Sequence, residues 1–138
     1  MAHWGVPGWV LLLLVGSAGS TAAQGRPPPT VELRENYPNP FFPATTIPFV
    51  LAPQRCEGGH RPLVSLKIYN VLAQHVAIPV LLHADGRRLD EVRLTCGLHE
   101  AYWDGSFRQK NRQLTPGIYY AQLVVDGERY TLKMIARR

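Results

Sequence analysis

The chain has 138 residues, enough for one small domain with a modest core. Its 15 Lys and Arg residues against 10 Asp and Glu give a net charge of +5, but the basic residues are scattered, with local groups only at 87–88, 107–112 and 136–138. We therefore expect no nucleic-acid binding, whereas attraction to an anionic outer surface such as lipopolysaccharide stays open. No apolar run approaches the roughly 20 residues of a membrane span, so no transmembrane segment is expected.

The N-terminal residues 1–23 have the features of a secretory signal peptide. The apolar block Trp9–Val15 is followed by small and polar residues, with Thr21 and Ala23 at the −3 and −1 positions of a cut before Gln24. A buried N-terminal helix is the alternative, but Gly and Ser break the apolar run too soon for one. We therefore expect an exported protein, in the periplasm in transit and then at the cell surface or outside the cell.

Residues 24–34 contain "RPPPT" and read as a proline-rich linker that cannot pair in a sheet. The following "NYPNPFFP" places Asn36, Pro38, Asn39 and Pro40 close together. Proline fixes φ and Asn side chains hydrogen-bond nearby backbone, so this segment predicts a rigid corner that opens a domain over residues 35–138.

From residue 45 onward, apolar residues recur with a period of two, which indicates strands rather than helices. Strands are expected at 45–52, 63–70, 75–82, 91–94, 98–103, 117–125 and 128–136. Asp126-Gly127 between the last two is typical of a type I′ hairpin turn. Pro48 lacks an N–H, which predicts an edge position for the first strand. The pattern favours an all-β, Ig-like antiparallel β-sandwich of about seven short strands.

Several residues have a structural interpretation in this sandwich. Trp103 is expected to fill the core at a strand end, Asp104 to form an Asx turn, and Gly105 to supply a positive φ. Pro116-Gly117 predicts a turn, and Tyr119 an inward aromatic side chain.

The two cysteines, Cys56 and Cys96, are most simply a disulfide in an exported protein. A metal site is the weaker alternative, because neither Cys-x-x-Cys nor His-x-x-x-His spacing accompanies them. No Ser-His-Asp, Cys-His or paired-carboxylate spacing is visible either. We expect no enzyme activity, no catalytic residue, no metal and no cofactor.

Five segments in this order, "NYPNPFFPATTIPFVL", "VSLKIYNVLAQHV", "GLHEAYWDG", "PGIYYAQL" and "YTLKMIARR", together carry a family likeness. They resemble the C-terminal sorting domain (type A) of type IX secretion cargo and, equally, the Ig-like domain of the flagellar hook-capping protein. The resemblance implies a seven-stranded sandwich whose last strands are recognised by the outer-membrane export machinery. In the family, the domain is commonly removed and the cargo is released or linked to an anionic lipopolysaccharide. The motif positions are Asn36, Pro38, Asn39, Pro40, Tyr69, Asn70, Trp103, Asp104, Gly105, Gly117 and Tyr119.

By this resemblance the export signal is expected in the last six residues, with Lys133, Met134, Ile135, Arg137 and Arg138 as its candidates. Two departures stand out. Ala73 replaces the glycine of the family's "YNxxG" turn, so this turn is expected to differ if the position needs a positive φ. In addition, no cargo domain stands between the signal peptide and the sandwich. The alternative is a stand-alone envelope protein that contacts other envelope proteins through sheet edges or the "FRQKNR" loop (residues 107–112).

Overall fold

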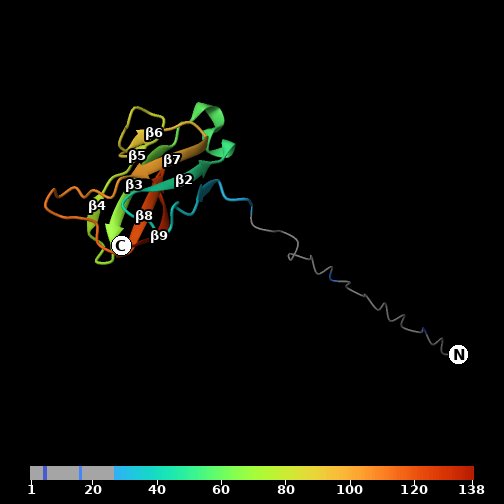
Figure 1. The fold of residues 1–138 in the computed structure, drawn as a ribbon. Coiled ribbons are helices and arrows are strands. Elements are labelled where there is room, and N and C mark those ends of the chain that lie inside the picture. Colours follow the sequence, from blue (N-terminus) through green and yellow to red (C-terminus); the bar gives the residue numbers. More distant parts are fainter. Residues whose placement is uncertain (1–4, 6–15, 17–26) are drawn as a thin grey trace.

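Two antiparallel sheets face each other across one core in the computed structural model, which describes residues 5, 16 and 27–138 (Figure 1). The proposed signal peptide and its cleavage site at Ala23 and Gln24 lie outside the described residues, apart from the isolated Gly5 and Gly16. The predicted all-β sandwich is confirmed.

The first sheet has the strand order β1-β2-β7-β5, and the second has the order β4-β3-β8-β9, with β6 also paired to β3. A short 3-10 segment, η2, connects β2 to β3. The bounds are β1 Val31–Leu33, β2 Thr45–Leu51, η2 Pro53–Gly59, β3 Leu63–Asn70, β4 His75–Ala77, β5 Val80–Leu81, β6 Val92–Arg93, β7 Gly97–Trp103, β8 Gly117–Val125 and β9 Glu128–Ala136.

The alternating residues of each long strand form the core. Ile47, Phe49 and Leu51 of β2 have no exposed surface, and they lie opposite an equally buried row from the second sheet. That row comprises Val64, Leu66 and Ile68 of β3 with Ala121, Leu123 and Val125 of β8. Period-two burial is what two sheets packed through one face each require.

The hairpin between β8 and β9 turns at Asp126 (φ 48°) and Gly127 (φ 86°). Positive φ at both central residues defines the predicted type I′ turn. Nine residue pairs, from Gly117–Ala136 to Val125–Glu128, follow in register.

Among the described residues, the sandwich has nine strands rather than about seven. The segment 75–82, predicted as one strand, is two: β4 pairs with β3 in the second sheet, and β5 pairs with β7 in the first. Pro79 lies between them and cannot donate to a ladder, so the chain leaves one sheet there and enters the other.

The start of the fold also differs from the prediction. Residues 31–33, assigned to the linker, form β1 and pair with β2 from Val31–Leu51 to Leu33–Phe49. The expectation that residues 24–34 cannot pair is therefore wrong for Val31, Glu32 and Leu33, which follow the prolines of the "RPPPT" segment.

Pro48 does not mark an edge strand, because β2 lies between β1 and β7. The carbonyl of Pro48 accepts the N–H of Arg34 at 2.9 Å. The N and C=O of one strand residue point to the same side, so the missing N–H faces β1 and not β7. The β1–β2 ladder ends at the pair Leu33–Phe49, so Pro48 lies one residue beyond it, where a missing N–H removes no bond of the ladder.

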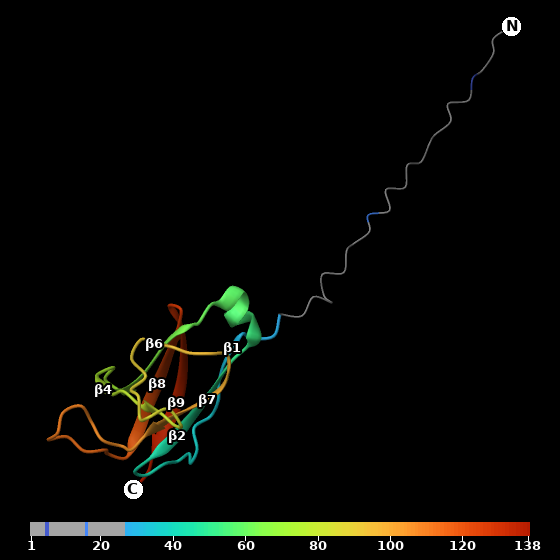
Figure 2. The ribbon, with the colours of Figure 1, turned by 90° about the horizontal axis from the view of Figure 1, so that it is seen from above.

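The two ends of the sandwich carry different features. η2 and the β8–β9 turn lie at one end, and the loop of residues 104–116 lies at the other, near the C-terminus (Figures 1 and 2).

Candidate functional site: the last strand and the proline-rich corner

The proline-rich segment is a corner fixed by a buried polar group. Asn36 is 2% exposed, and its Nδ2 donates to Thr45 Oγ1 at 3.0 Å and to the Pro38 carbonyl at 3.3 Å. The Thr45 hydroxyl donates to the same Pro38 carbonyl at 3.1 Å. The peptide bonds that precede Pro38, Pro40 and Pro43 are cis. The corner is therefore held at the beginning of β2 by its own side chains.

The corner also binds the end of β9. The Phe41 N–H donates to the Ile135 carbonyl, and the Arg137 N–H donates to the Phe41 carbonyl, both at 2.9 Å. The Ile135 N–H donates to Asn39 Oδ1 at 3.3 Å. These three bonds join residues almost a hundred positions apart into a short parallel bridge at Phe41 and Ala136.

β9 is the edge strand of the second sheet, and the corner covers only its last residues. Ile135 and Arg137 direct their backbone groups toward the corner, so Arg129, Thr131 and Lys133 direct theirs to the same side. Among the described residues, these three have no backbone partner on that side. Within the described residues, the edge of β9 from Arg129 to Lys133 thus has no backbone hydrogen bonds on that side, with β1 of the other sheet lying close to it; we call this segment the open edge of β9.

The five proposed export residues divide by burial. Met134 is fully buried and packs in the core. Ile135 is 42% exposed, and the side chains of Lys133, Arg137 and Arg138 are also exposed. A partner that reads the folded domain therefore meets Lys133, Ile135 and the two arginines, but not Met134.

An aromatic cluster closes the core beneath the corner. Trp103 packs 5.5 Å from Phe41 and 5.5 Å from Tyr119 between ring centroids, and Phe107 lies 6.3 Å from Trp103. Tyr119 is 3% exposed, and its hydroxyl donates to the Thr115 carbonyl at 3.1 Å. The cluster joins the corner, β7, β8 and the 104–116 loop.

The "WDG" residues form a local turn. Asp104 Oδ1 accepts the Ser106 N–H at 2.8 Å and the Ser106 hydroxyl at 2.5 Å, and these bonds lower the pKa of the Asp104 carboxyl. The indole N–H of Trp103 donates to the Ser106 carbonyl at 2.9 Å. Gly105 has φ 88°, and a Cβ there would lie 2.3 Å from the Pro43 carbonyl oxygen. Glycine is therefore required both by the backbone and by the neighbouring corner.

The "YNVLAQ" turn after β3 keeps the left-handed residue that the family glycine would supply. Ala73 has φ 59°, so the expected change of turn is not found. Asn70 Oδ1 accepts the N–H groups of Leu72 and Gln74, each at 3.0 Å. The ring of Tyr69 lies 5.5 Å from that of His75. Gly117, at the start of β8, has φ 144° and is exposed.

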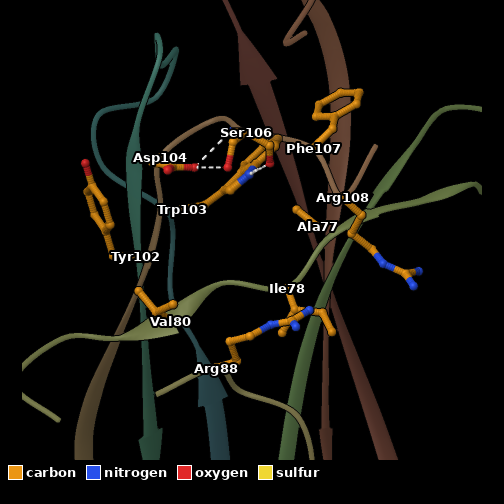
Figure 3. A pocket seen from close by; sticks show the side chains of 10 residues that line it. All are labelled: Ala77, Ile78, Val80, Arg88, Tyr102, Trp103, Asp104, Ser106, Phe107 and Arg108. Carbon is orange, nitrogen blue, oxygen red and sulfur yellow. Dashed lines mark hydrogen bonds between the residues drawn. The ribbon is translucent and has the colours of Figure 1, made fainter. Parts of the chain in front are cut away.

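A surface hollow of about 510 Å³ lies beside the turn formed by Trp103, Asp104 and Ser106 (Figure 3). Figure 3 shows the Asp104 carboxylate turned toward Ser106, to which its Oδ1 is hydrogen-bonded. Arg88 and Arg108 are the cationic side chains of the described lining, which holds no histidine and no second carboxylate. This arrangement offers positive charge for binding an anion. The lining residues are Ala77, Ile78, Val80, Arg88, Tyr102, Trp103, Asp104, Ser106, Phe107 and Arg108.

The chain gives no significant match to models of known protein families, to curated proteins or to solved structures. The resemblance to sorting domains therefore stays a prediction. Within the described residues, no cluster of three or more His, Cys, Asp or Glu side chains could hold a metal ion. None of the helical segments described is long and apolar enough to cross a membrane.

The opposite end of the sandwich is held by the predicted disulfide. Cys56 in η2 is bonded to Cys96 before β7, with 6.1 Å between their Cα atoms. This confirms the pairing and joins the two connections at this end.

Arg55, beside the disulfide, was not singled out by the sequence. Its guanidinium donates to Thr30 Oγ1 at 2.8 Å, to the Tyr130 hydroxyl at 3.2 Å and to the Glu128 carboxylate. Its position after Pro53 gave no indication of these partners, since Glu128 and Tyr130 lie more than seventy residues further along the chain.

Proposed function

We propose that this protein is an exported, non-enzymatic Ig-like module that acts as a sorting or anchoring domain of the type IX secretion pathway. The observation that carries the proposal is the open edge of β9 with its exposed Lys133 and Ile135. An edge strand offers unpaired backbone donors and acceptors to a partner, and alternate side chains give the contact its specificity. The export machinery of the outer membrane is the proposed partner, and an anionic surface polysaccharide is the proposed anchor.

The corner supports this proposal by fixing the end of the strand. Asn39 and Phe41 hold residues 135–137 in place, so the exposed side chains keep one arrangement. A preorganised strand loses less conformational freedom when a partner binds it.

The test is a secreted reporter followed by residues 27–138, expressed in a bacterium that has the type IX system. Deleting residues 133–138 would also remove Met134 and Ala136 from the core, so substitutions are the sharper tool. The double variant Lys133→Glu/Ile135→Ser leaves the core intact and should hold the reporter in the periplasm. Glu32→Lys/Glu57→Ser, also exposed and on other elements, is the control and should be delivered normally. Surface delivery of the Lys133/Ile135 variant at the control level would overturn the proposal.

A second candidate is a stand-alone envelope protein with a binding or structural role. The exposed apolar residues Val71 and Leu72 beside the basic 104–116 loop favour it. Mass spectrometry of surface material separates the two candidates. Missing C-terminal peptides indicate processing as a sorting signal, whereas an intact domain indicates a binding module.

A further inference from the structure

One end of the sandwich combines exposed aliphatic side chains with cations. Val71 is 62% exposed, Leu72 is 74% exposed and Phe42 is 49% exposed. Each value is high for an apolar side chain, and the first two residues are adjacent in the chain. We call this surface, made of Phe42, Val71, Leu72, Lys110 and Arg112, the basic–apolar end.

Two hollows connect these residues into one surface. Val71, Leu72 and Arg112 line a hollow of about 440 Å³. Phe42, Lys110 and Arg112 line a second hollow of about 610 Å³. Arg112 therefore stands between the aliphatic pair and Phe42.

The charge of this end is strongly positive. Among the described residues that line the two hollows, Asp104 is the one acidic side chain, and it already accepts two hydrogen bonds from Ser106. Arg137 and Arg138 add to this charge. The Arg137 N–H donates to the carbonyl of Phe41, the residue before Phe42, so the C-terminal arginines lie next to this end. Lys110 and Arg112 are exposed, and neither takes part in an ion pair among the described residues; Arg112 Nη1 donates to Gln74 Oε1 at 3.4 Å.

The aliphatic pair is held outward by a well-bonded turn. The Asn70 N–H donates to the Gln74 carbonyl at 3.1 Å, and the Ala73 N–H donates to the Asn70 carbonyl at 3.0 Å. The Asn70 side chain bonds the Leu72 N–H and both the backbone and side chain of Gln74. With its backbone fixed in this way, the turn keeps Val71 and Leu72 in solvent in the isolated domain.

We propose that the basic–apolar end docks on an anionic lipid bilayer, with Val71 and Leu72 inserted below the headgroups and Lys110 and Arg112 at the phosphates. Basic side chains around an apolar tip are the combination that binds anionic membranes at the interface. An anionic polysaccharide would satisfy the cations, but it would leave the aliphatic pair in water. Only a partner that offers both anionic groups and an apolar interior, as an anionic bilayer does, matches the cations and the aliphatic pair together.

The experiment is flotation of the full chain with vesicles of phosphatidylcholine, alone or with one third phosphatidylglycerol. The apolar block at residues 9–15 is present in every variant, so only differences between variants are interpreted. Protein collected after export, with its N-terminus sequenced, provides a second preparation. We expect binding to the anionic vesicles that weakens at high ionic strength.

Two pairs of variants test the two chemistries. Val71→Ser/Leu72→Ser should lower affinity about tenfold or more, whereas Leu98→Ser, which removes an apolar side chain that is 56% exposed on β7, should not. Lys110→Glu/Arg112→Glu should lower affinity at least about twentyfold, at about fivefold for each basic residue lost. Arg61→Glu/Arg129→Glu makes the same change in net charge away from this end and should have a much smaller effect.

The variant Leu72→Trp gives a readout that does not depend on loss of binding. Its added fluorescence should shift to shorter wavelength on the anionic vesicles and stay unshifted on neutral vesicles. Equal loss of affinity in test and control variants would overturn the proposal. So would binding to the anionic vesicles that is unaffected by the Val71/Leu72 variant, because the surface would then recognise charge alone.

Discussion

The Ile135 N–H donates to Oδ1 of Asn39, which lies 96 residues earlier in the chain. With the two backbone bonds of Phe41, this contact holds the end of the last strand against the corner that opens the domain. The corner predicted at the start of the domain thus also covers the last residues of β9.

Removing this contact should loosen the end of β9. In Asn39→Ala, we expect the amide of Ile135 to exchange with solvent faster and the free energy of unfolding to fall by about 0.5–1.5 kcal/mol. Hydrogen exchange and urea unfolding measure the two effects. Glu35→Ala removes only the exposed bond between Asn39 Nδ2 and Glu35, at 3.0 Å, and should leave the Ile135 amide protected. Equal exchange in the two variants would contradict this assignment.

Alanine variants at Gly105 and Gly127 distinguish the cost of backbone strain from the cost of a steric clash. Their φ values are 88° and 86°, but a Cβ at Gly105 meets the Pro43 carbonyl, whereas one at Gly127 meets nothing within 4 Å. Alanine at either position costs about 1–2 kcal/mol for the left-handed backbone. Gly105→Ala should cost about 1–3 kcal/mol more, because the corner has to move. Urea midpoints that coincide for the two variants would show that the corner does not pack on Gly105.

Ala73 is a strained position that glycine should relieve. With φ 59°, alanine there is strained by about 1–2 kcal/mol, which glycine would relieve. Glycine also has more conformational freedom in the unfolded chain, and this offsets part of the gain in stability. We expect Ala73→Gly to raise the free energy of unfolding by up to about 1 kcal/mol. The control Ala52→Gly, at φ −69°, should lower it, since that residue has an ordinary backbone. Thermal and urea unfolding should give the same order.

The disulfide should contribute substantially to stability. It closes a loop with a sequence separation of 40, for which the chain-entropy estimate gives about 4 kcal/mol. The double variant Cys56→Ser/Cys96→Ser should lose about that amount in urea unfolding. Reductant should shift the urea midpoint of the native chain but not that of the variant. A native chain with the same midpoint in both conditions would argue against a stabilising bond.

His75 should make stability fall in mild acid. Burial lowers its pKa from the usual value, and the charges of Arg108 and Lys67 lower it further, against the raising effects of the Ala77 carbonyl and Asp90. The Arg108 guanidinium lies 2.8 Å from His75 Nδ1, and Nε2 lies 3.0 Å from the Ala77 carbonyl. Neutral His75, with its proton on Nε2, satisfies both bonds.

The direction follows from proton binding. Between the lowered folded pKa and the unfolded value near 6.5, the unfolded chain binds more protons at His75. Neutral His75 therefore makes its full contribution to the free energy of unfolding above about pH 6.5. That contribution is lost as the pH falls from about 6.5 toward the lowered folded pKa. Urea midpoints at several pH values measure the slope, and His75→Gln should flatten it. An unchanged slope in His75→Gln would assign the effect to other groups.

The sequence by itself determined the strands and most of their faces. Alternation places Ile47, Phe49 and Leu51 in the core because successive strand residues point to opposite faces. The hairpin at Asp126-Gly127 could also be predicted, because the φ values of a two-residue turn depend on the two residues that form it. These features are local, so a local pattern encodes them.

Only the tertiary structure decided which segments meet. The sequence shows that Pro48 lacks an N–H. Which neighbouring strand that missing donor faces depends on β1, whose residues were predicted to belong to a linker. It shows Pro79 within an apolar run, but not that the chain changes sheets there. The bond from Ile135 to Asn39 has no sequence pattern at all, because backbone groups at a sheet edge accept any suitably placed partner. The open edge of β9 and the basic–apolar end both follow from such distant contacts.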